Sequence, residues 1–369
     1  MAKSVVGVGD ARAVKRYGAA LVHETSQSSF TMRNLTSTSG DLPIHRLTDL
    51  ESQAGDQITV DIYHRLTSTG QYGDVNLVGT QEKLTSDTMT MLINQVSNGV
   101  NAGSIMSRKR TLWNHREIAM MKQREWWGRW YDEQFFVTAA GTRGAQTGDW
   151  LLPVGYTGYA GNTIAAYTSD RAIIHHSQTA ENAITSSDFM DMEMLEYIQY
   201  QLKTMAHPPK PCMIDGEELY LLILNPYSEW TLRKAAGAGD WAQIKKYAKE
   251  GQNEIFRDSL GRFGNLLMFS HSKIPKTNSG ASSVAVDHNL LLGRQAVAVA
   301  HGNASQAGQA QGQQFRWHEE LANLGTELLI QTFAIVGHKK VVLKFTENAS
   351  AGSDFGVLSV LTYGGAAVS

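Results

Sequence analysis

The feature that most restricts the fold is a long helical pattern that runs from residue 104 to about residue 139. No proline interrupts it, Ser104 can cap its start, and Gly141 lies just past its end. The apolar side chains that recur on one side of it are Ile105, Leu112, Met120, Trp127, Tyr131 and Phe135. With a rise of 1.5 Å per residue, the pattern predicts a rigid rod of roughly 50 Å.

Aromatic and basic residues gather on this predicted helix. Four of the eight tryptophans lie on it, and they are Trp113, Trp126, Trp127 and Trp130. Such a surface can bind nucleic acid, but a packed helix with a charged outer face explains the same pattern, and we favour that interpretation. The expected packing residues are Trp113, Met120, Trp127, Tyr131 and Phe135. The basic residues that could face DNA or a protein interface are Arg108, Lys109, Arg110 and Arg124.

A β-hairpin with an unusually long connection precedes the helix. Residues 58–63 alternate between apolar and polar side chains, as in a half-buried strand, and residues 88–93 repeat the pattern. The connection is far longer than an ordinary hairpin loop, and residues 69–74 are rich in turn formers. A two-stranded ribbon is marginal in isolation. The extension therefore needs a surface to lie on, and another molecule could provide it.

The rest of the chain mixes helices and short strands. Residues 187–206 form a second amphipathic helix, which Pro208 and Pro209 end. Residues 141–180 are rich in glycine and threonine and are typical of loops and short strands. Apolar runs at 219–224, 266–269, 290–292, 296–300, 341–345 and 355–361 predict strands, whereas 328–336 fits either a strand or a buried helix. Because no βαβ unit repeats, we expect an α+β fold.

Residues 1–54 carry no long periodic pattern. Two interpretations fit them equally: an irregular segment over the chain's own core, or an arm laid across a neighbouring subunit. The whole chain has 369 residues, and single cores stop growing at about 250–300. We therefore expect two or three packing units.

Charge and cysteine content exclude several classes of protein. The net charge of −2 argues against tight binding to phosphates, which needs a basic excess, so contact with DNA should be loose. The single cysteine, Cys212, permits neither an intrachain disulfide nor a multi-cysteine metal site, in keeping with intracellular assembly. No signal peptide is visible, and no stretch reaches the roughly 18 apolar residues that span a membrane.

No catalytic or metal-binding motif is complete. His318 and Glu319 resemble the start of a zinc motif, but Ala322 occupies the place of its second histidine. Residues 7–9 and 235–240 lack parts of the glycine-rich phosphate motifs. We expect no enzymatic activity, no cofactor and no metal. The carboxylates expected on a solvated or interfacial helix face, rather than in an acid–base pair, are Asp188, Asp191, Glu193 and Glu196.

Several segments, in their order along the chain, resemble one known family. They are residues 55–60, 73–74, 77–82, 126–132, 225–233, 261–275, 291–296 and 354–358. Together they resemble the major capsid proteins of the N-four-like tailed bacteriophages, which adopt the Hong Kong 97 (HK97-like) capsid fold. The resemblance extends from about residue 17 to about residue 363.

The resemblance implies an N-terminal arm (1–54), an extended E-loop hairpin (55–100), a P-domain with a spine helix (101–206), a region that is mainly A-domain (207–335) and returning C-terminal strands (336–369). Copies would form the pentamers and hexamers of an icosahedral virion head around packaged double-stranded DNA, assembled in the host cytoplasm. The E-loop residues expected to contact a neighbouring subunit are Gly70, Gln71, Tyr72, Gly73, Asp74, Leu77 and Glu82.

Further expectations concern partners. The hairpin begins near residue 56, which leaves no room for the long scaffold segment of some relatives, so we expect a separate scaffolding protein, beside a portal and a decoration or cement protein. No lysine lies between Gly70 and Gly79, so no lysine–asparagine crosslink is expected from the loop tip. Two alternatives stay open: an encapsulin-like shell around cargo, and a homo-oligomeric enzyme whose site is invisible in sequence.

Overall fold

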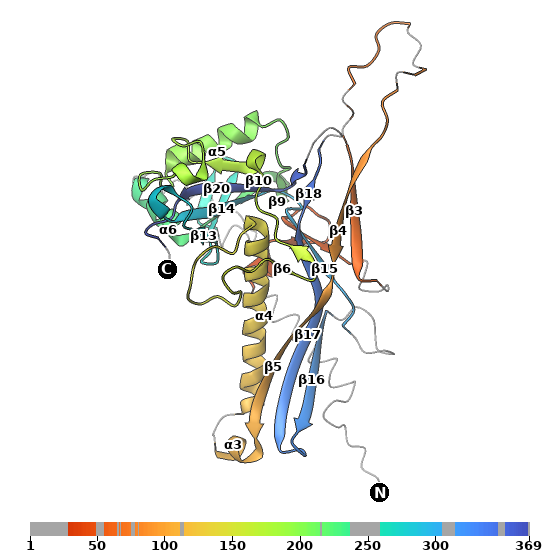
Figure 1. The fold of residues 1–369 in the computed structure, drawn as a ribbon, viewed down its shortest axis with the longest axis vertical. Helices are drawn as coiled ribbons and strands as arrows, with labels where there is room; N and C mark the ends of the chain where they lie inside the picture. Colours follow the sequence, from red (N-terminus) through yellow and green to blue (C-terminus); the bar gives the residue numbers. More distant parts are fainter. Residues whose placement is uncertain are drawn as a thin grey trace.

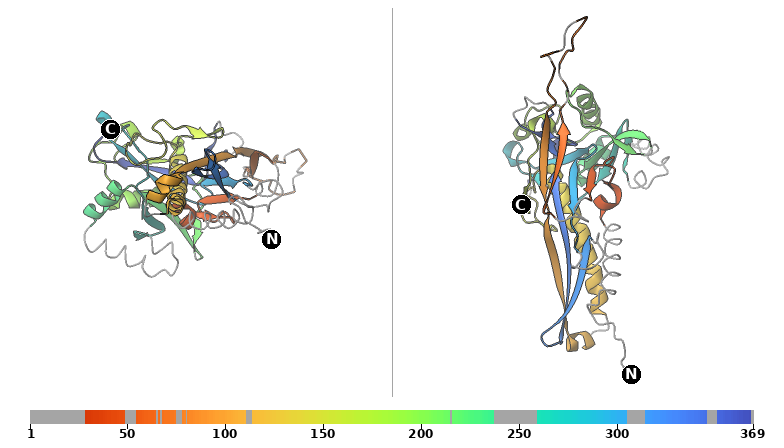
Figure 2. Two further views of the ribbon diagram at one scale, coloured as in Figure 1. Left: turned by 90° about the horizontal axis from the view of Figure 1, so that it is seen from below. Right: turned by 90° about the vertical axis from the view of Figure 1, so that its right-hand side faces the viewer.

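The computed structural model describes residues 29–48, 55–64, 66, 68–74, 78–79, 81–110, 114–214, 216–236, 259–304, 314–345 and 351–367. The molecule is elongated (Figure 1). A compact part contains α5 (Met192–Thr204) and α6 (Pro226–Ala235). A stalk built around α4 (His115–Ala140) leaves it in one direction, and the hairpin of β3 (Gln57–Tyr63) and β4 (Ser86–Leu92) projects in the other (Figures 1 and 2).

The stalk sheet is organised around β17 (Glu327–Lys340). This strand pairs antiparallel with β16 (Phe315–Ala322), with β5 (Asn94–Ser104) and, at its end, with β15 (Val297–His301). β15 in turn pairs parallel with β2 (Ile44–Leu47), and β2 with β1 (Thr36–Ser37). Every second residue from Leu328 to Val336 is buried, as expected for a strand with one face on a helix. Residues 328–336 therefore form a strand, which periodicity alone left open.

The compact part contains an eight-stranded sheet. Its main order is β11 (Gly261–Phe263), β12 (Leu266–Ser270), β10 (Glu217–Leu224), β14 (Val286–Leu292), β20 (Val357–Tyr363) and β8 (Ala172–Ile174), with β9 (Cys212–Ile214) on β10 and β13 (Lys276–Thr277) on β14. Leu222 and Leu224 belong to the core under α5, whereas Leu221 and Ile223 belong to the core that contains α4. Because both faces are covered, β10 is a continuous apolar run, as predicted.

Shorter elements complete the fold. They are the helices α2 (Phe30–Asn34) and α3 (Ile105–Arg110), the 3₁₀ turns η2 (Ser169–Arg171), η3 (Glu181–Ala183) and η4 (Ala281–Ser283), and the strand pairs β6 (Gly158–Tyr159) with β7 (Asn162–Thr163) and β18 (Val342–Leu343) with β19 (Ser353–Asp354).

The spine helix is shorter than the sequence predicted. β5 continues to Ser104, which pairs with Glu327, and the Ser104 hydroxyl also accepts a hydrogen bond from the Ser107 N–H at the start of the separate α3. α4 begins after Asn114, whose side chain accepts a hydrogen bond from the Arg116 N–H, and it ends at Gly141 in the left-handed conformation. A helix does begin after Ser104 and the expected end is confirmed, but the pattern is divided between α3 and α4, so the expectation of one uninterrupted helix is wrong. α3 has no buried residue, so the first apolar positions of the pattern do not pack as a helix face.

The second helix also begins later than predicted. α5 starts after Asp191, whose carboxylate accepts a hydrogen bond from the Met194 N–H. Asp188 therefore lies outside the helix. It is buried and accepts hydrogen bonds from Ser177, Gln178 and Thr185, so its expected place on a solvated helix face is wrong.

The path of β17 crosses the domain boundary that was expected between residues 335 and 336. The strand runs without interruption across residue 335. β15 and β16 belong to the stalk sheet, although they lie in the region expected to be mainly A-domain.

Candidate assembly surfaces

The hairpin extension, residues 65–84 between β3 and β4, is exposed at every residue of it that the structure describes. Gly70, Gln71, Gly73 and Asp74 are exposed, and the side chain of Tyr72 is 84% exposed. Glu82 is exposed as well and accepts a hydrogen bond from the Ser68 N–H at 2.8 Å. Leu77 lies outside the described residues. Apolar side chains exposed on the hairpin and its connection are Tyr63, Leu66, Tyr72, Val78 and Leu84.

The stem of the extension is firmly held. Ile58, Met89 and Met91 are buried in a cluster with residues of β15 and β18. The side-chain amide of Asn162 accepts a hydrogen bond from the Leu92 N–H and donates one to the Leu92 carbonyl oxygen. The hairpin pairing continues to a hydrogen bond from the His64 N–H to the Thr85 carbonyl oxygen. A well-anchored stem thus presents a tip whose described residues are exposed.

The spine helix packs against the stalk sheet mainly through its aromatic side chains. Trp127 is fully buried and donates its indole N–H to the Thr332 hydroxyl at 2.8 Å, and that hydroxyl donates to the Gln123 amide oxygen. Tyr131 and Phe135 are also buried, and burial raises the pKa of the Tyr131 phenol, an effect that Arg46 only partly offsets. Met120 is half-buried against the cluster around Ile330 and Leu328, and Trp113 lies outside the described residues.

The far end of the stalk carries the basic residues. Lys109 and Arg110 are exposed in the last turn of α3, Arg108 is half-buried beside them, and Arg124 is half-buried on α4. Arg116 forms a bidentate contact with the buried Glu319 of β16, with nitrogen–oxygen distances of 2.6–3.0 Å. Exposed apolar side chains at this end are Ile105, Met106, Ile118, Met121, Leu321 and Leu324.

A buried carboxylate ties the start of the described chain to the spine. Asp132 of α4 accepts hydrogen bonds from the hydroxyls of Ser29 and Thr31 at 2.7 Å and from the backbone N–H groups of Phe30 and Thr31 at 3.2 and 3.0 Å. Ser29 also caps α2. The pattern of residues 1–54 gave no sign of this contact, because its two halves lie 101–103 residues apart.

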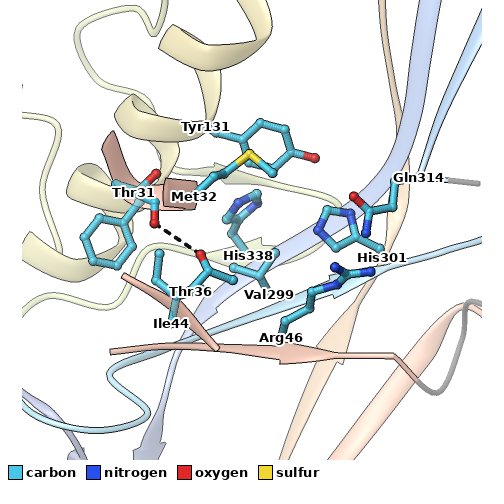
Figure 3. Close-up of a pocket in the computed structure, with 11 residues that line it drawn as sticks. Thr31, Met32, Thr36, Ile44, Arg46, Tyr131, Val299, His301, Gln314 and His338 are labelled. Carbon is cyan, nitrogen blue, oxygen red and sulfur yellow. Dashed lines mark hydrogen bonds between the residues drawn. The ribbon is translucent and has the colours of Figure 1, made fainter. Parts of the chain in front are cut away.

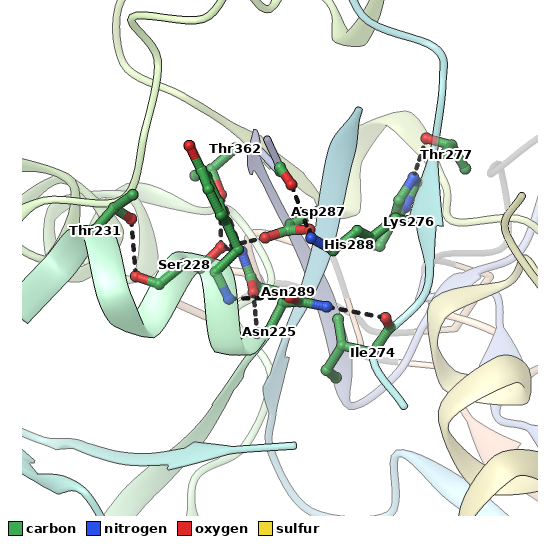
Figure 4. A network of polar contacts seen from close by, with 12 residues as sticks. Asn225, Ser228, Thr231, Ile274, Lys276, Thr277, Asp287, His288, Asn289 and Thr362 are labelled. Carbon is green, nitrogen blue, oxygen red and sulfur yellow. Dashed lines mark hydrogen bonds and ion pairs between the residues drawn. The ribbon is translucent and has the colours of Figure 1, made fainter. Parts of the chain in front are cut away.

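A second buried cluster joins α6 to the sheet (Figure 4). Asp287 accepts a hydrogen bond from the Ser228 hydroxyl at 2.6 Å and lies 3.3 Å from the Lys276 ammonium group. The Asn289 amide donates to Ser228 and to Thr362. Burial raises the pKa of Asp287, although Lys276 and Ser228 oppose this. Ser228 is fully buried, so this cluster holds α6 to β14 and β20 and offers no access to a substrate.

The remaining residues that could act in catalysis or metal binding are either paired with other side chains or shielded by burial. Glu319 is occupied by Arg116 and by the Trp317 indole N–H. Ser177 and Asp188 both lie next to the same ring nitrogen of His175, Nδ1, and the Ser177 hydroxyl donates to Asp188. In a hydrolase triad the serine and the carboxylate lie at opposite ring nitrogens, so these three residues do not form such a proton relay. Burial raises the pKa of the Cys212 thiol to about 12, which leaves it a poor nucleophile.

The part of the chain that the structure describes carries neither a metal cluster nor a membrane-spanning helix. No group of three or more His, Cys, Asp or Glu side chains there could hold a metal ion. None of the helices there is long and apolar enough to cross a membrane.

Comparison with known proteins decides the family. A family model for phage capsid proteins matches residues 5–366. The chain belongs to the phage capsid protein family. No curated protein matches its sequence. Among solved structures, the capsid of Ralstonia phage GP4 is 30% identical and aligns over 98% of both chains with a TM-score of 0.81.

Two more distant capsids share the fold of this capsid protein. The capsid of cyanophage Pam1 has 16% identity, a TM-score of 0.67 and coverage of 90% of this chain and 91% of that one. The head of Helicobacter pylori bacteriophage KHP40 has 12% identity, a TM-score of 0.61 and coverage of 91% and 90%. The predicted HK97-like fold and capsid family are thereby confirmed. The capsid protein is a structural protein of the phage head.

The structure brings together only part of the predicted site. Among the described residues, those expected on the E-loop share one exposed extension, and Trp127, Tyr131 and Phe135 of the spine are buried. Arg108, Lys109 and Arg110 lie together on α3, whereas Arg124 lies on α4. Sequence reasoning missed Asp132 and the buried ion pair between Lys340 and Asp354, whose charged atoms are 2.9 Å apart. No local signal could reveal either, since each depends on partners brought together by tertiary folding.

Proposed function

We propose that the capsid protein is the main building block of the phage head, assembling as pentamers and hexamers into an icosahedral shell around packaged double-stranded DNA. The observation that carries this proposal is the hairpin extension. Its stem is buried in the subunit, while the Tyr72 side chain is 84% exposed and that of Val78 is 79% exposed. Apolar side chains displayed on a thin ribbon gain stability only when another surface covers them.

The second half of the proposal concerns the opposite end of the molecule. Leu321 at the end of β16 and Leu324 at the turn between β16 and β17 are exposed, and so are Ile118 and Met121 near the start of α4. With contacts at both ends, each subunit would reach several neighbours. Many modest interfaces of this kind reinforce one another in a closed shell, because each contact raises the effective concentration of the next.

We assign the remaining partners by the same reasoning. The net charge of −2 supports only loose contact with packaged DNA, for which Arg108, Lys109, Arg110 and Arg124 are the candidate residues. A separate scaffolding protein, a portal and a decoration protein are the further partners we propose. The domain limits expected from the resemblance stay a proposal, with β15–β17 assigned to the stalk and hence to the P-domain. Assembly in the host cytoplasm is proposed on the same basis.

We also propose that the protein has no catalytic activity. The buried serine, cysteine and histidine groups described above are engaged in packing or shielded from solvent, which supports this view over an enzyme. A phage-head subunit is favoured over an encapsulin-like cargo shell because the family match spans almost the whole chain and the relative in Ralstonia phage GP4 is a phage capsid.

The test removes the extension and keeps its stem. In the variant, an Asn-Gly turn replaces residues 65–84, directly after the His64–Thr85 pair, since this dipeptide closes two-residue hairpins. A second variant replaces only Tyr72 and Val78 by serine. Native mass spectrometry of the full chain should show pentamers, hexamers or shells, and both variants should shift towards monomers with unchanged circular dichroism. Folded variants that oligomerise like the unaltered chain would overturn the proposal.

A further inference from the structure

The hairpin is joined to the stalk sheet through a single residue. β4 of the hairpin ends at Leu92 and β5 of the stalk begins at Asn94, so only Ile93 lies between them. Because β3 and β4 pair along their whole length, the stem keeps whatever direction is fixed at this end. The direction of the extension therefore depends on how the backbone is held at Leu92.

One edge of β4 faces away from its partner strand. The Ile93 N–H donates to the Asp56 carbonyl oxygen, next to the start of β3. In an antiparallel ladder the backbone groups of alternate residues point towards the partner strand. The odd-numbered residues of β4 therefore face β3, and the backbone groups of Leu92 and Thr90 face away from it. These groups need partners other than a strand of the hairpin.

The side chain of Asn162 supplies both partners at Leu92. Its amide oxygen accepts a hydrogen bond from the Leu92 N–H at 3.0 Å, and its amide nitrogen donates one to the Leu92 carbonyl oxygen at 2.6 Å. An amide group thus offers the same donor and acceptor as the backbone of a neighbouring strand. Farther along this edge, Lys339 Nζ donates to the Thr90 carbonyl oxygen at 2.6 Å.

Asn162 is itself connected to the spine helix. It pairs with Tyr159 across a two-residue turn, residues 160–161, in which both φ angles are positive, as in the tight turns that suit hairpins. The Tyr159 hydroxyl lies 2.9 Å from His338 Nδ1 of β17. The His338 ring lies 5.5 Å from the Tyr131 ring of α4 (Figure 3). A continuous path of contacts joins the spine helix to the base of the extension.

Gly337 of β17 lies against the same part of the hairpin. A Cβ at this position would overlap the Leu92 carbonyl oxygen. The φ of Gly337 lies outside the left-handed range, so the close approach alone requires a glycine here. Asn162 and Gly337 together form a clamp on the Leu92 carbonyl oxygen.

We propose that Asn162 and Gly337 are positioning residues, which set the direction in which the extension leaves its subunit. This inference rests on the proposed function, in which the extension must reach a neighbour. Loss of the clamp leaves the pairing of β3 with β4 intact but frees the stem to turn at Leu92. Fewer closed shells then form, because a closed shell needs the same contact geometry in every copy.

The test measures a distance within one subunit. Spin labels are attached at Asp61→Cys on β3 and Lys122→Cys on α4, both exposed positions, while the buried Cys212 stays unlabelled. Pulsed electron paramagnetic resonance is recorded on the full chain at a concentration where native mass spectrometry detects single subunits. Since strands rise about 3.4 Å per residue, Asp61, the partner of Thr88, lies about 14 Å beyond Leu92, and a rotation of about 20° there moves its label by about 5 Å.

Asn162→Ala and Gly337→Ala should each broaden the distance distribution or move its mean by that amount. Asn225→Ala is the matched control for the first variant, because Asn225 is equally buried and its amide likewise accepts one backbone hydrogen bond and donates another. Gly99→Ala is the control for the second, since a Cβ there makes only ordinary contacts. Both controls should leave the distance unchanged.

The two possible failures are distinguishable, because the distance is measured on unassembled subunits and does not depend on shell formation. The inference is overturned if either clamp variant, folded by circular dichroism, keeps the distance of the unaltered chain. It is also overturned if the control variants change the distance equally.

Discussion

Asp132 shows how one side chain can fix the path of a distant segment. Four donors from Ser29, Phe30 and Thr31 converge on its two oxygens, and its side chain is only 7% exposed. A carboxylate is needed here because it accepts hydrogen bonds at both oxygens and donates none. An amide in its place would direct an N–H₂ group at other donors.

Asp132→Asn should therefore lower the free energy of unfolding by about 1–3 kcal/mol, the cost of leaving buried donors unpaired. It should also expose residues 29–34 to proteolysis. Asp149→Asn is the matched control, because Asp149 pairs with Arg129 at the surface with its side chain 83% exposed, and exposed pairs contribute ~1 kcal/mol or less. Chemical denaturation measures both variants, and equal losses would contradict the role assigned to Asp132.

Two buried histidines make stability depend on pH. Burial lowers the pKa of both His301 and His338 to about 3, with Arg46 and His338 adding to the effect on His301. In the unfolded chain each would titrate near 6.5. Between these values the unfolded state binds more protons than the folded state, so stability falls as the pH falls.

We expect the free energy of unfolding to decrease from about pH 6.5 towards about pH 3, by up to ~1.4 kcal/mol per pH unit for each histidine. His338→Gln should reduce this slope. Denaturant titrations across the range measure it, and a slope that is the same in the variant would show that His338 does not contribute. The sequence alone predicts neither histidine, because an isolated histidine carries no sign of its burial.

At the scale of the element, the ends of helices were partly predictable from local residues. Gly141 marks the end of α4 as predicted, and Asp191 caps α5 although the predicted start was earlier. The start of α4 was missed because Asn114 caps it, while no proline or glycine between residues 105 and 114 marks a break in the helical pattern.

Gly141 also allows a close approach between the end of α4 and the backbone at Ala165. Its φ is +75°, and a Cβ there would approach the Ala165 carbonyl oxygen to 2.4 Å. Gly148 also has a positive φ, +103°, but has no atom within 4 Å of a Cβ. Gly148→Ala should cost about 1–2 kcal/mol through backbone strain alone. Gly141→Ala should cost a further 1–3 kcal/mol, roughly, through overpacking. Thermal unfolding compares them, and equal costs would contradict the close approach.

At the scale of the whole molecule, the elongated shape comes from the stalk at one end and the hairpin extension at the other, and the two have different sequence patterns. The stalk comes from a helix and strands that bury apolar faces against each other. Periodicity predicts the helix, leaves β17 open and gives no prediction for β5 or β16. The extension has little apolar periodicity and was recognised by its length and polarity instead. Which surfaces it contacts is not encoded locally, because the contacts belong to the assembly.

The most direct test of the shell proposal is electron microscopy of purified assemblies at about 0.15 M ionic strength, carried to a resolution that traces the chain. We expect closed icosahedral particles made of pentamers and hexamers, with residues 66–84 of each subunit lying on a neighbour. Small rings or single subunits, or an extension folded back on its own subunit inside a closed particle, would contradict the account.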